Sequence, residues 1–211
     1  PKEAKNVEYT ENAPAHVVQE ALKLGRCAII TEGKAEGIFS EIDRVTVAAG
    51  TMTAEGRAAD FEQIISAPQI TKYGYDLKLQ RNLLAHAGIR LEGTLMDIEL
   101  MHYLINPEKT HKVEILAKTY LGVNLEESES TPEAMETLSL FDEIPEDETR
   151  PSKAKEAAVI FLLGEAVWKD METNGVQTLY MEMEEPLLKV LSDMEMEGVK
   201  IDLAQLRKYA A

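Results

Sequence analysis

The sequence has 211 residues, of which 45% are hydrophobic and 28% are charged, and this suits one α/β domain with room for a core. Its formal net charge is −16. Domains that bind nucleic acid by themselves are usually basic, because their affinity comes from neutralising phosphates, so we expect this chain alone to bind DNA weakly. Cys27 is the only cysteine, which excludes an internal disulfide. The sequence contains no apolar run of about 18 residues, the length that would predict a membrane span.

Short apolar runs predict strands, and apolar residues spaced three and four apart predict helices. In chain order the predicted elements are strand 6–10, helix 13–24, strands 27–30 and 42–49, helix 58–65, strand 69–73, helices 76–87, 95–105, 113–120, 152–171 and 180–197, strand 198–202 and a helix from Leu203. Gly33 and Gly37 are expected to interrupt the chain after the second strand. Strands and helices alternate before the chain turns helical, which predicts a mixed α/β sheet covered by helices.

Residues 126–148 differ in composition from the rest of the chain. The segment is crowded with Asp and Glu and contains no Lys or Arg. Such a run is typical of a solvated acidic loop. Two other interpretations stay open, namely a mimic that competes with DNA for a basic groove and a module that binds a basic partner protein.

Three stretches resemble the bacterial DNA polymerase I family, the family A DNA polymerases. Residues 185–202 read EPLLKVLSDMEMEGVKID and are similar to the segment that joins the exonuclease domain of this family to its polymerase domain. Residues 74–80, GYDLKLQ, are similar to the family pattern G-Q-N-x-K-Y-D. Residues 95–107, LMDIELMHYLINP, are similar to F-D-T-M-L-x-x-Y-L-L-x-P. The three matches occur in the family's order.

The resemblance implies a ribonuclease-H-like fold, with a mixed five-stranded sheet flanked by helices. It divides the chain into a 3′-5′ exonuclease-like domain at 1–184 and a connecting helix with the start of a polymerase domain at 185–211. We therefore expect a piece of a longer, cytoplasmic bacterial protein, a DNA-directed DNA polymerase of replication and repair. Its partners would be the polymerase domain of the same polypeptide and, through that parent protein, DNA. We expect no membrane partner.

Active exonucleases of this family use four carboxylates to hold two divalent metal ions roughly 4 Å apart, which activate a water molecule. The resemblance places these carboxylates at Ile30, Glu32, Gln80 and Ile160, which we term the ligand positions. It places the tyrosine that orients the water at Glu156. Only Glu32 keeps a carboxylate among the four ligand positions. Because Mg²⁺ and Mn²⁺ prefer hard oxygen ligands, we expect no catalytic residues and no bound metal cofactor.

An active nuclease with displaced ligands is the alternative, and its candidate carboxylates are Glu32, Asp76 and Glu156. Mg²⁺ or Mn²⁺ would be its cofactor. Each acid also has a simpler interpretation: Glu32 as a solvated loop residue, Asp76 as the N-cap of the helix that follows it, and Glu156 as a surface acid in the first turn of its helix. Asp97 matches the family pattern outside the metal ligands, and we interpret it as the cap of the following helix.

Overall fold

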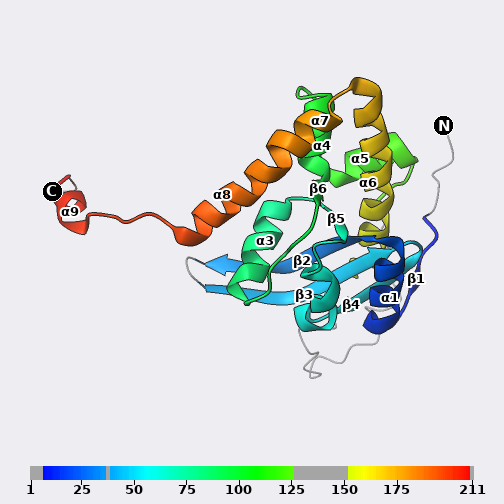
Figure 1. Ribbon diagram of the computed structural model, residues 1–211, viewed down its shortest axis with the longest axis horizontal. Coiled ribbons are helices and arrows are strands. Elements are labelled where there is room, and N and C mark those ends of the chain that lie inside the picture. Colours follow the sequence, from blue (N-terminus) through cyan, green and yellow to red (C-terminus); the bar gives the residue numbers. More distant parts are fainter. Residues whose placement is uncertain (1–6, 37–38, 126–151, 210–211) are drawn as a thin grey trace, which may run out of the picture.

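The computed structural model describes residues 7–36, 39–125 and 152–209 (Figure 1). A twisted sheet lies at one side of the molecule, helices cover both of its faces, and the last helix lies apart from it. The predicted acidic segment 126–148 lies outside the described residues. Within the described residues, none of the helices combines the length and the apolar character that crossing a bilayer requires.

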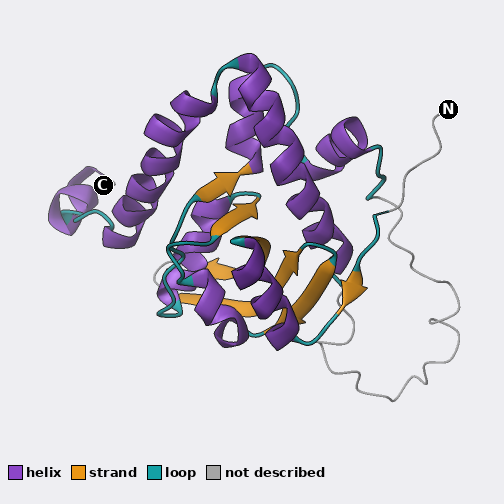
Figure 2. Ribbon diagram, turned by 45° about the vertical axis from the view of Figure 1, so that its right-hand side comes forward, coloured by secondary structure: helices purple, strands orange, loops and turns teal. Residues whose placement is uncertain are grey.

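The sheet is mixed and has the order β1-β4-β3-β2-β5-β6 (Figure 2). Its strands are β1 Thr10–Glu11, β2 Arg26–Glu36, β3 Phe39–Ala49, β4 Met52–Gly56, β5 Thr71–Gly74 and β6 Leu95–Asp97. The β2–β3 and β3–β4 pairs are antiparallel, whereas β1–β4, β2–β5 and β5–β6 are parallel. The mixed α/β sheet is therefore confirmed, but the expected number of five strands is wrong, because the described residues form a sheet of six.

Several strand boundaries differ from those expected. Gly33 does not end β2, because the strand continues through a bulge between Glu32 and Gly33. A Cβ atom at Gly33 would lie 2.3 Å from the Glu41 carbonyl oxygen, so only glycine fits there. The tight turn after β3 leads directly into β4. The strand β4 was not among the elements predicted from the sequence. Residues 198–202 form no strand.

The helices mostly lie where the apolar spacing predicted them. Their bounds are α1 Pro14–Leu24, α2 Glu62–Ile65, α3 Leu77–His86, α4 Ile98–Ile105, α5 Val113–Leu116, α6 Ala154–Asn174, α7 Gln177–Leu179, α8 Glu185–Glu197 and α9 Leu203–Tyr209. A 3-10 turn, Ala58–Phe61, precedes α2, and π-helical turns at Ala117–Leu121 and Tyr180–Glu184 follow α5 and α7. The division of the chain at residue 184 stays a prediction.

Two hydrophobic clusters cover the two faces of the sheet. Because side chains alternate along a strand, Cys27 and Ile29 face the cluster built with α1 and α3, whereas Ala28 and Ile30 face the cluster built with α6. The long helix α6 approaches the sheet closely at Gly164, where an added Cβ atom would lie 2.2 Å from the ring of Tyr73. The face of the sheet that carries the predicted site is therefore covered by α6.

The Asp97 carboxylate organises the end of β6. Its Oδ1 atom accepts hydrogen bonds from the backbone N–H groups of Glu99 and Leu100, which confirms Asp97 as the cap of α4. Its Oδ2 atom accepts a third bond, of 2.7 Å, from the N–H of Leu77 at the start of α3. Burial raises the pKa of Asp97 to about 6, although the three N–H donors act in the opposite direction. Residues 95–97 are thus a strand that precedes the helix, and not part of it.

The Tyr180 hydroxyl joins the C-terminal helices to the sheet. It accepts a 2.7 Å hydrogen bond from the Asp97 N–H and donates one of 2.7 Å to the Leu95 carbonyl. The side chain is fully buried. Both backbone groups of β6 depend on this one hydroxyl, which supplies a donor and an acceptor at the edge of the sheet.

We predict that Tyr180→Phe lowers the free energy of unfolding by about 1–3 kcal/mol, because it leaves two buried backbone groups without their partner. Urea unfolding followed by circular dichroism measures the change. Tyr209→Phe is the matched control, since Tyr209 is 87% exposed and should lose almost nothing. Equal stability of the two variants would contradict the role assigned to this hydroxyl.

Candidate functional site

Two of the four ligand positions are part of the hydrophobic core. Ile160 lies on α6 and is 1% exposed, within the cluster that fills the space between α6 and the sheet. Ile30 lies on β2 and packs against the same cluster. An aliphatic side chain offers no lone pair to a cation, and the surrounding apolar groups would penalise a nearby charge. These two positions therefore supply packing and no ligand.

Gln80, the third ligand position, is buried and has both polar atoms of its side chain bonded to backbone. Its Oε1 atom accepts a 2.9 Å hydrogen bond from the N–H of Thr31 on β2. Its Nε2 atom donates a 2.9 Å hydrogen bond to the Tyr75 carbonyl, just before α3. A carboxylate could accept the first bond but could not donate the second. The amide thus ties α3 to the strand that carries Ile30 and Glu32.

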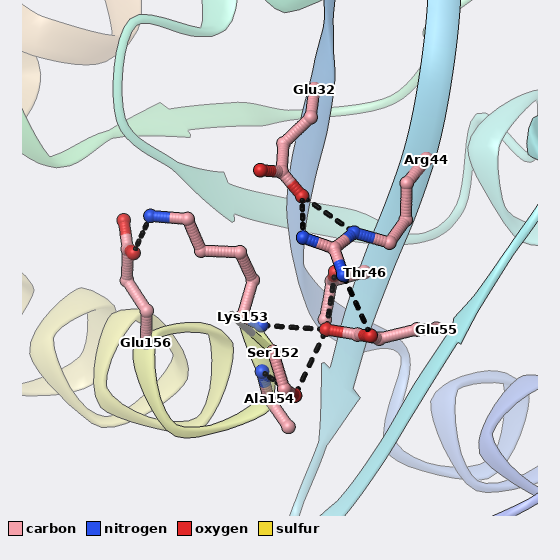
Figure 3. A network of polar contacts seen from close by, with 8 residues as sticks. All are labelled: Glu32, Arg44, Thr46, Glu55, Ser152, Lys153, Ala154 and Glu156. Carbon is pink, nitrogen blue, oxygen red and sulfur yellow. Dashed lines mark hydrogen bonds and ion pairs between the residues drawn. The ribbon is translucent and has the colours of Figure 1, made fainter. Parts of the chain in front are cut away.

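Glu32, the fourth position, is held by an arginine on the neighbouring strand (Figure 3). The Glu32 Oε2 atom lies 2.7 Å from both Nε and one terminal nitrogen of Arg44. The other terminal nitrogen of Arg44 lies 3.1 Å from Glu55 on β4. The Arg44 side chain is only 13% exposed, so solvent screens this bridge less than a surface ion pair. The interpretation of Glu32 as a solvated loop acid is wrong, because the residue belongs to β2 and its carboxylate is paired.

Glu55 extends the same network to the start of α6. Its Oε1 atom accepts hydrogen bonds from the Lys153 N–H at 2.6 Å and from the Ser152 hydroxyl at 3.0 Å. The Ser152 hydroxyl in turn accepts a bond from the Ala154 N–H. A carboxylate at a helix N-terminus is favourable for the helix dipole. Side chains from β2, β3 and β4 therefore hold the helix that carries Glu156 and Ile160 (Figure 3).

The acids considered for a rebuilt site have separate partners. Asp76 is the N-cap of α3 and accepts a bond from the Leu79 N–H, as expected from the sequence. Glu156 lies in the first turn of α6 and pairs with Lys153. Across the described residues, no group of three or more His, Cys, Asp or Glu side chains is placed to share a metal ion. The structure does not bring Glu32, Asp76 and Glu156 together.

Sequence reasoning missed Arg44 and Glu55, although the strand register contains the signal. Glu32 lies directly opposite Arg44 in the β2–β3 pair, and Thr46 lies directly opposite Glu55 in the β3–β4 pair. Oppositely charged residues that face each other across antiparallel strands attract. Recognising the pair required the bulge at Gly33, because the bulge shifts the register by one residue.

A pair of divalent ions does not fit the side chains at the ligand positions. A single carboxylate would have to serve both ions, and it already binds a guanidinium that carries a fixed positive charge. A cation at Glu32 would lie beside Arg44 and repel it, unless Arg44 moved away from two acids at once. The arrangement binds three strands and the start of α6 to one another.

A family described as "DNA polymerase I, ribonuclease H-like domain" matches residues 36–130 of the chain. Among curated proteins, DNA polymerase I of Pseudomonas aeruginosa is 26% identical over 214 residues, which cover 95% of this chain and 22% of that protein. DNA polymerase I of Bacillus subtilis is 29% identical over 150 residues, which cover 70% of this chain and 17% of that protein. The chain thus spans about a fifth of the length of these two relatives.

Solved structures show the same fold. The polymerase Pol1 of M. smegmatis, determined with a DNA primer-template, superposes with a TM-score of 0.72 at 20% identity, over 96% of this chain and 34% of that one. NrnC of Brucella melitensis, determined with bound Mg²⁺, gives a TM-score of 0.67 at 16% identity over 94% of this chain and 98% of that one. Escherichia coli RNase D, an exoribonuclease, gives 0.67 at 16% identity over 91% of this chain and 52% of that one.

The six-stranded mixed sheet with its covering helices is therefore ribonuclease-H-like, as the resemblance implied. Family match, relatives and fold agree with the three sequence stretches that first suggested the assignment. By family match, relatives and fold, the chain is similar to the ribonuclease-H-like domain of DNA polymerase I.

Proposed function

We propose that this domain does not hydrolyse DNA and instead supports an adjoining DNA polymerase domain in its parent protein. The parent would be a cytoplasmic bacterial enzyme that copies DNA without editing by this domain. With its net charge of −16, the domain would contact DNA only through that parent. The proposal rests on what the ligand positions do in the folded chain, and it assigns no catalytic residue and no metal to them.

The observation that carries the proposal is the bonding of Gln80. If a carboxylate ligand had been replaced at random, after the metal site was no longer needed, the neutral side chain in its place would have no specific bonding partners. Gln80 instead uses its donor and its acceptor to join α3 to β2. Satisfying these two buried backbone groups is a structural role that an amide can perform and an ionised carboxylate cannot.

The bridge that Arg44 forms between Glu32 and Glu55 also supports a structural role for the ligand positions. In a metal-dependent nuclease, cations hold the acids of different elements together. Here a guanidinium holds Glu32 to Glu55, and Glu55 holds the start of α6. The elements that carried the family's ligands are thus linked by the chain's own side chains, without any requirement for a bound ion.

The proposal predicts that the purified chain leaves labelled single-stranded DNA intact in a 3′→5′ digestion assay, with Mg²⁺ and then with Mn²⁺. Glu32→Ala should behave identically, and an active exonuclease of the same fold serves as the positive control. Metal-dependent digestion that Glu32→Ala abolishes would overturn the proposal. Digestion that Glu32→Ala leaves unchanged would indicate a contaminating nuclease, to be separated by a further purification step before the assay is read.

Gln80→Glu tests whether an amide is required at this position. The new carboxylate would face the Tyr75 carbonyl, so we expect the free energy of unfolding at pH 7 to fall by about 1–3 kcal/mol. Burial and the carbonyl dipole raise the folded-state pKa of this carboxyl above its unfolded value of about 4.3. The protonated form can donate to Tyr75, so the loss should be small below pH of about 4 and should grow as pH rises through the folded-state pKa.

Gln63→Glu on the exposed face of α2 is the matched control, because it makes the same chemical change where solvent surrounds the side chain. Urea unfolding of both variants over a range of pH gives the comparison. If the two variants show the same dependence on pH, the Gln80 amide does not hold α3 to β2.

A further inference from the structure

Two histidines from neighbouring elements meet where α4 packs beside α6 (Figure 1). His102 lies on α4 and is 5% exposed, whereas His111 lies in the loop between α4 and α5 and is half-buried. Their Nδ1 atoms are 2.7 Å apart, and their rings meet edge to face. At this distance one Nδ1 atom carries a proton and the other accepts it, because a neutral imidazole has one donor and one acceptor nitrogen. We term these two residues the histidine pair.

Neighbouring aromatic rings orient the histidine pair. Tyr120, in the π-helical turn after α5, meets the His102 ring edge to face, with 6.0 Å between the ring centroids. The Tyr120 hydroxyl donates a 2.6 Å hydrogen bond to the Asp170 carboxylate on α6, which fixes that ring in turn. Tyr103 contacts the His111 ring, at 5.7 Å between centroids. Packing therefore directs the two Nδ1 atoms toward one point before anything binds there.

The surroundings favour the neutral form of His102. Burial lowers the pKa of His102 below its ordinary value of about 6.5, and the nearby His111 and Lys109 lower this pKa further, whereas Asp170 acts in the opposite direction. A second proton on the pair would also leave two N–H donors facing each other. Neutral imidazole is the form that binds metal ions, because its lone pair is then available.

A cavity of about 420 Å³ opens beside the pair, with His102, Tyr120 and Asp170 on its wall. The Asp170 carboxylate places negative charge near a cation bound by the pair. Lys109 also lies on the wall, but it is exposed, and its long side chain can carry the ammonium group into solvent. The cavity leaves room for the water molecules that would complete the coordination of such a cation.

We propose that His102 and His111 bind one divalent transition-metal ion through their two Nδ1 atoms, in place of the proton that they share. Imidazole nitrogen suits Zn²⁺, Ni²⁺ and Cu²⁺, whereas Mg²⁺ and Mn²⁺ prefer oxygen ligands. On binding, the shared proton leaves Nδ1 and the same ring becomes protonated at Nε2, so two neutral histidines release no net proton. Tetrahedral zinc holds two nitrogens roughly 3.3 Å apart, a little farther than the 2.7 Å of the pair, and the loop that carries His111 allows this small movement.

The proposed site is open and differs from a nuclease centre. The described residues place no third His, Cys, Asp or Glu where it could share an ion with the pair, so water supplies the remaining ligands. We therefore expect weaker binding than in a closed zinc site with four protein ligands. The pair lies on α4 and the loop after it, whereas the ligand positions lie on β2, α3 and α6. The inference does not depend on the proposed function.

Calorimetric titration of the untagged chain with Zn²⁺ at neutral pH tests the proposal, with excess Mg²⁺ present to occupy loose acidic sites. We expect one saturable ion per chain and at least about tenfold weaker binding in His111→Gln, which removes one of the two ligands. His86→Gln is the matched control, because His86 is exposed in the last turn of α3 and should bind Zn²⁺ like the unaltered chain. Circular dichroism checks that both variants are folded.

Electron paramagnetic resonance of Cu²⁺ bound to the unaltered chain gives a second measurement, which does not depend on how a substitution affects folding. We expect hyperfine coupling to two imidazole nitrogens. Coupling to one nitrogen or to none would overturn the proposal.

The titration also separates this site from the ligand positions. Zn²⁺ binding that is absent, or that is equal in the unaltered chain and in His111→Gln, would overturn the proposal, because the pair would then share a proton only. Binding that Glu32→Ala abolishes and His111→Gln leaves intact would place the ion at the ligand positions, and would contradict both this inference and the proposed function. Digestion of DNA with Mg²⁺, together with Zn²⁺ binding lost in His111→Gln, would contradict the proposed function alone.

Discussion

The link between α3 and β2 through the Gln80 amide is the contact on which the rest of the predicted site depends. It requires a side chain with one donor and one acceptor, since it must satisfy the N–H of Thr31 and the carbonyl of Tyr75 at once. That requirement excludes a carboxylate from the position as long as the two backbone groups remain where they are. Ile30 and Glu32 flank the bonded N–H in the sequence, so the amide also fixes the strand segment that carries two other ligand positions.

The chain has the fold of its relatives, and we propose that the contacts at the ligand positions differ in kind from those of a metal site. Two of these positions are part of the core packing, one is a clamp on backbone groups, and the acid Glu32 is half of an ion-pair network with Arg44 and Glu55. Fold and activity are separable in this way because an activity depends on a few side chains, whereas the fold depends on the clusters on both faces of the sheet. A domain that only supports a neighbouring domain needs its fold and does not need a metal site.

The parts of the structure that local patterns determine were predictable. The short apolar run Cys27–Ile30 identified a buried strand, and Asp97 was recognised as the residue at a helix start, where it accepts backbone N–H bonds. The sequence alone shows that Ile30, Gln80 and Ile160, three positions at which the resemblance places metal ligands, carry no carboxylate. What these side chains contact instead could not be predicted, because the partners of Gln80 are backbone groups that become its neighbours only after α3 packs on the sheet.

The incorrect and missed predictions also arise from contacts that exist only in the folded chain. The strand β4 is five residues long and follows a tight turn, so its pairing with β3 identifies it better than its own sequence does. The strand β6 has three residues, too few to show a period of two before α4 begins. The pairing of Glu32 with Arg44 depends on a bulge at Gly33, and a register between strands is a property of the sheet rather than of either segment.

We propose that side chains of the chain itself occupy the positions at which the resemblance places metal ions. A titration with Mn²⁺, followed by the loss of the free-ion electron paramagnetic resonance signal, tests this most directly. We expect the chain and its Glu32→Gln variant to give the same weak, non-saturating curve, because Mn²⁺ is attracted only loosely to a strongly acidic surface. Saturable binding of one or two Mn²⁺ ions by the intact chain that is lost in Glu32→Gln would contradict it.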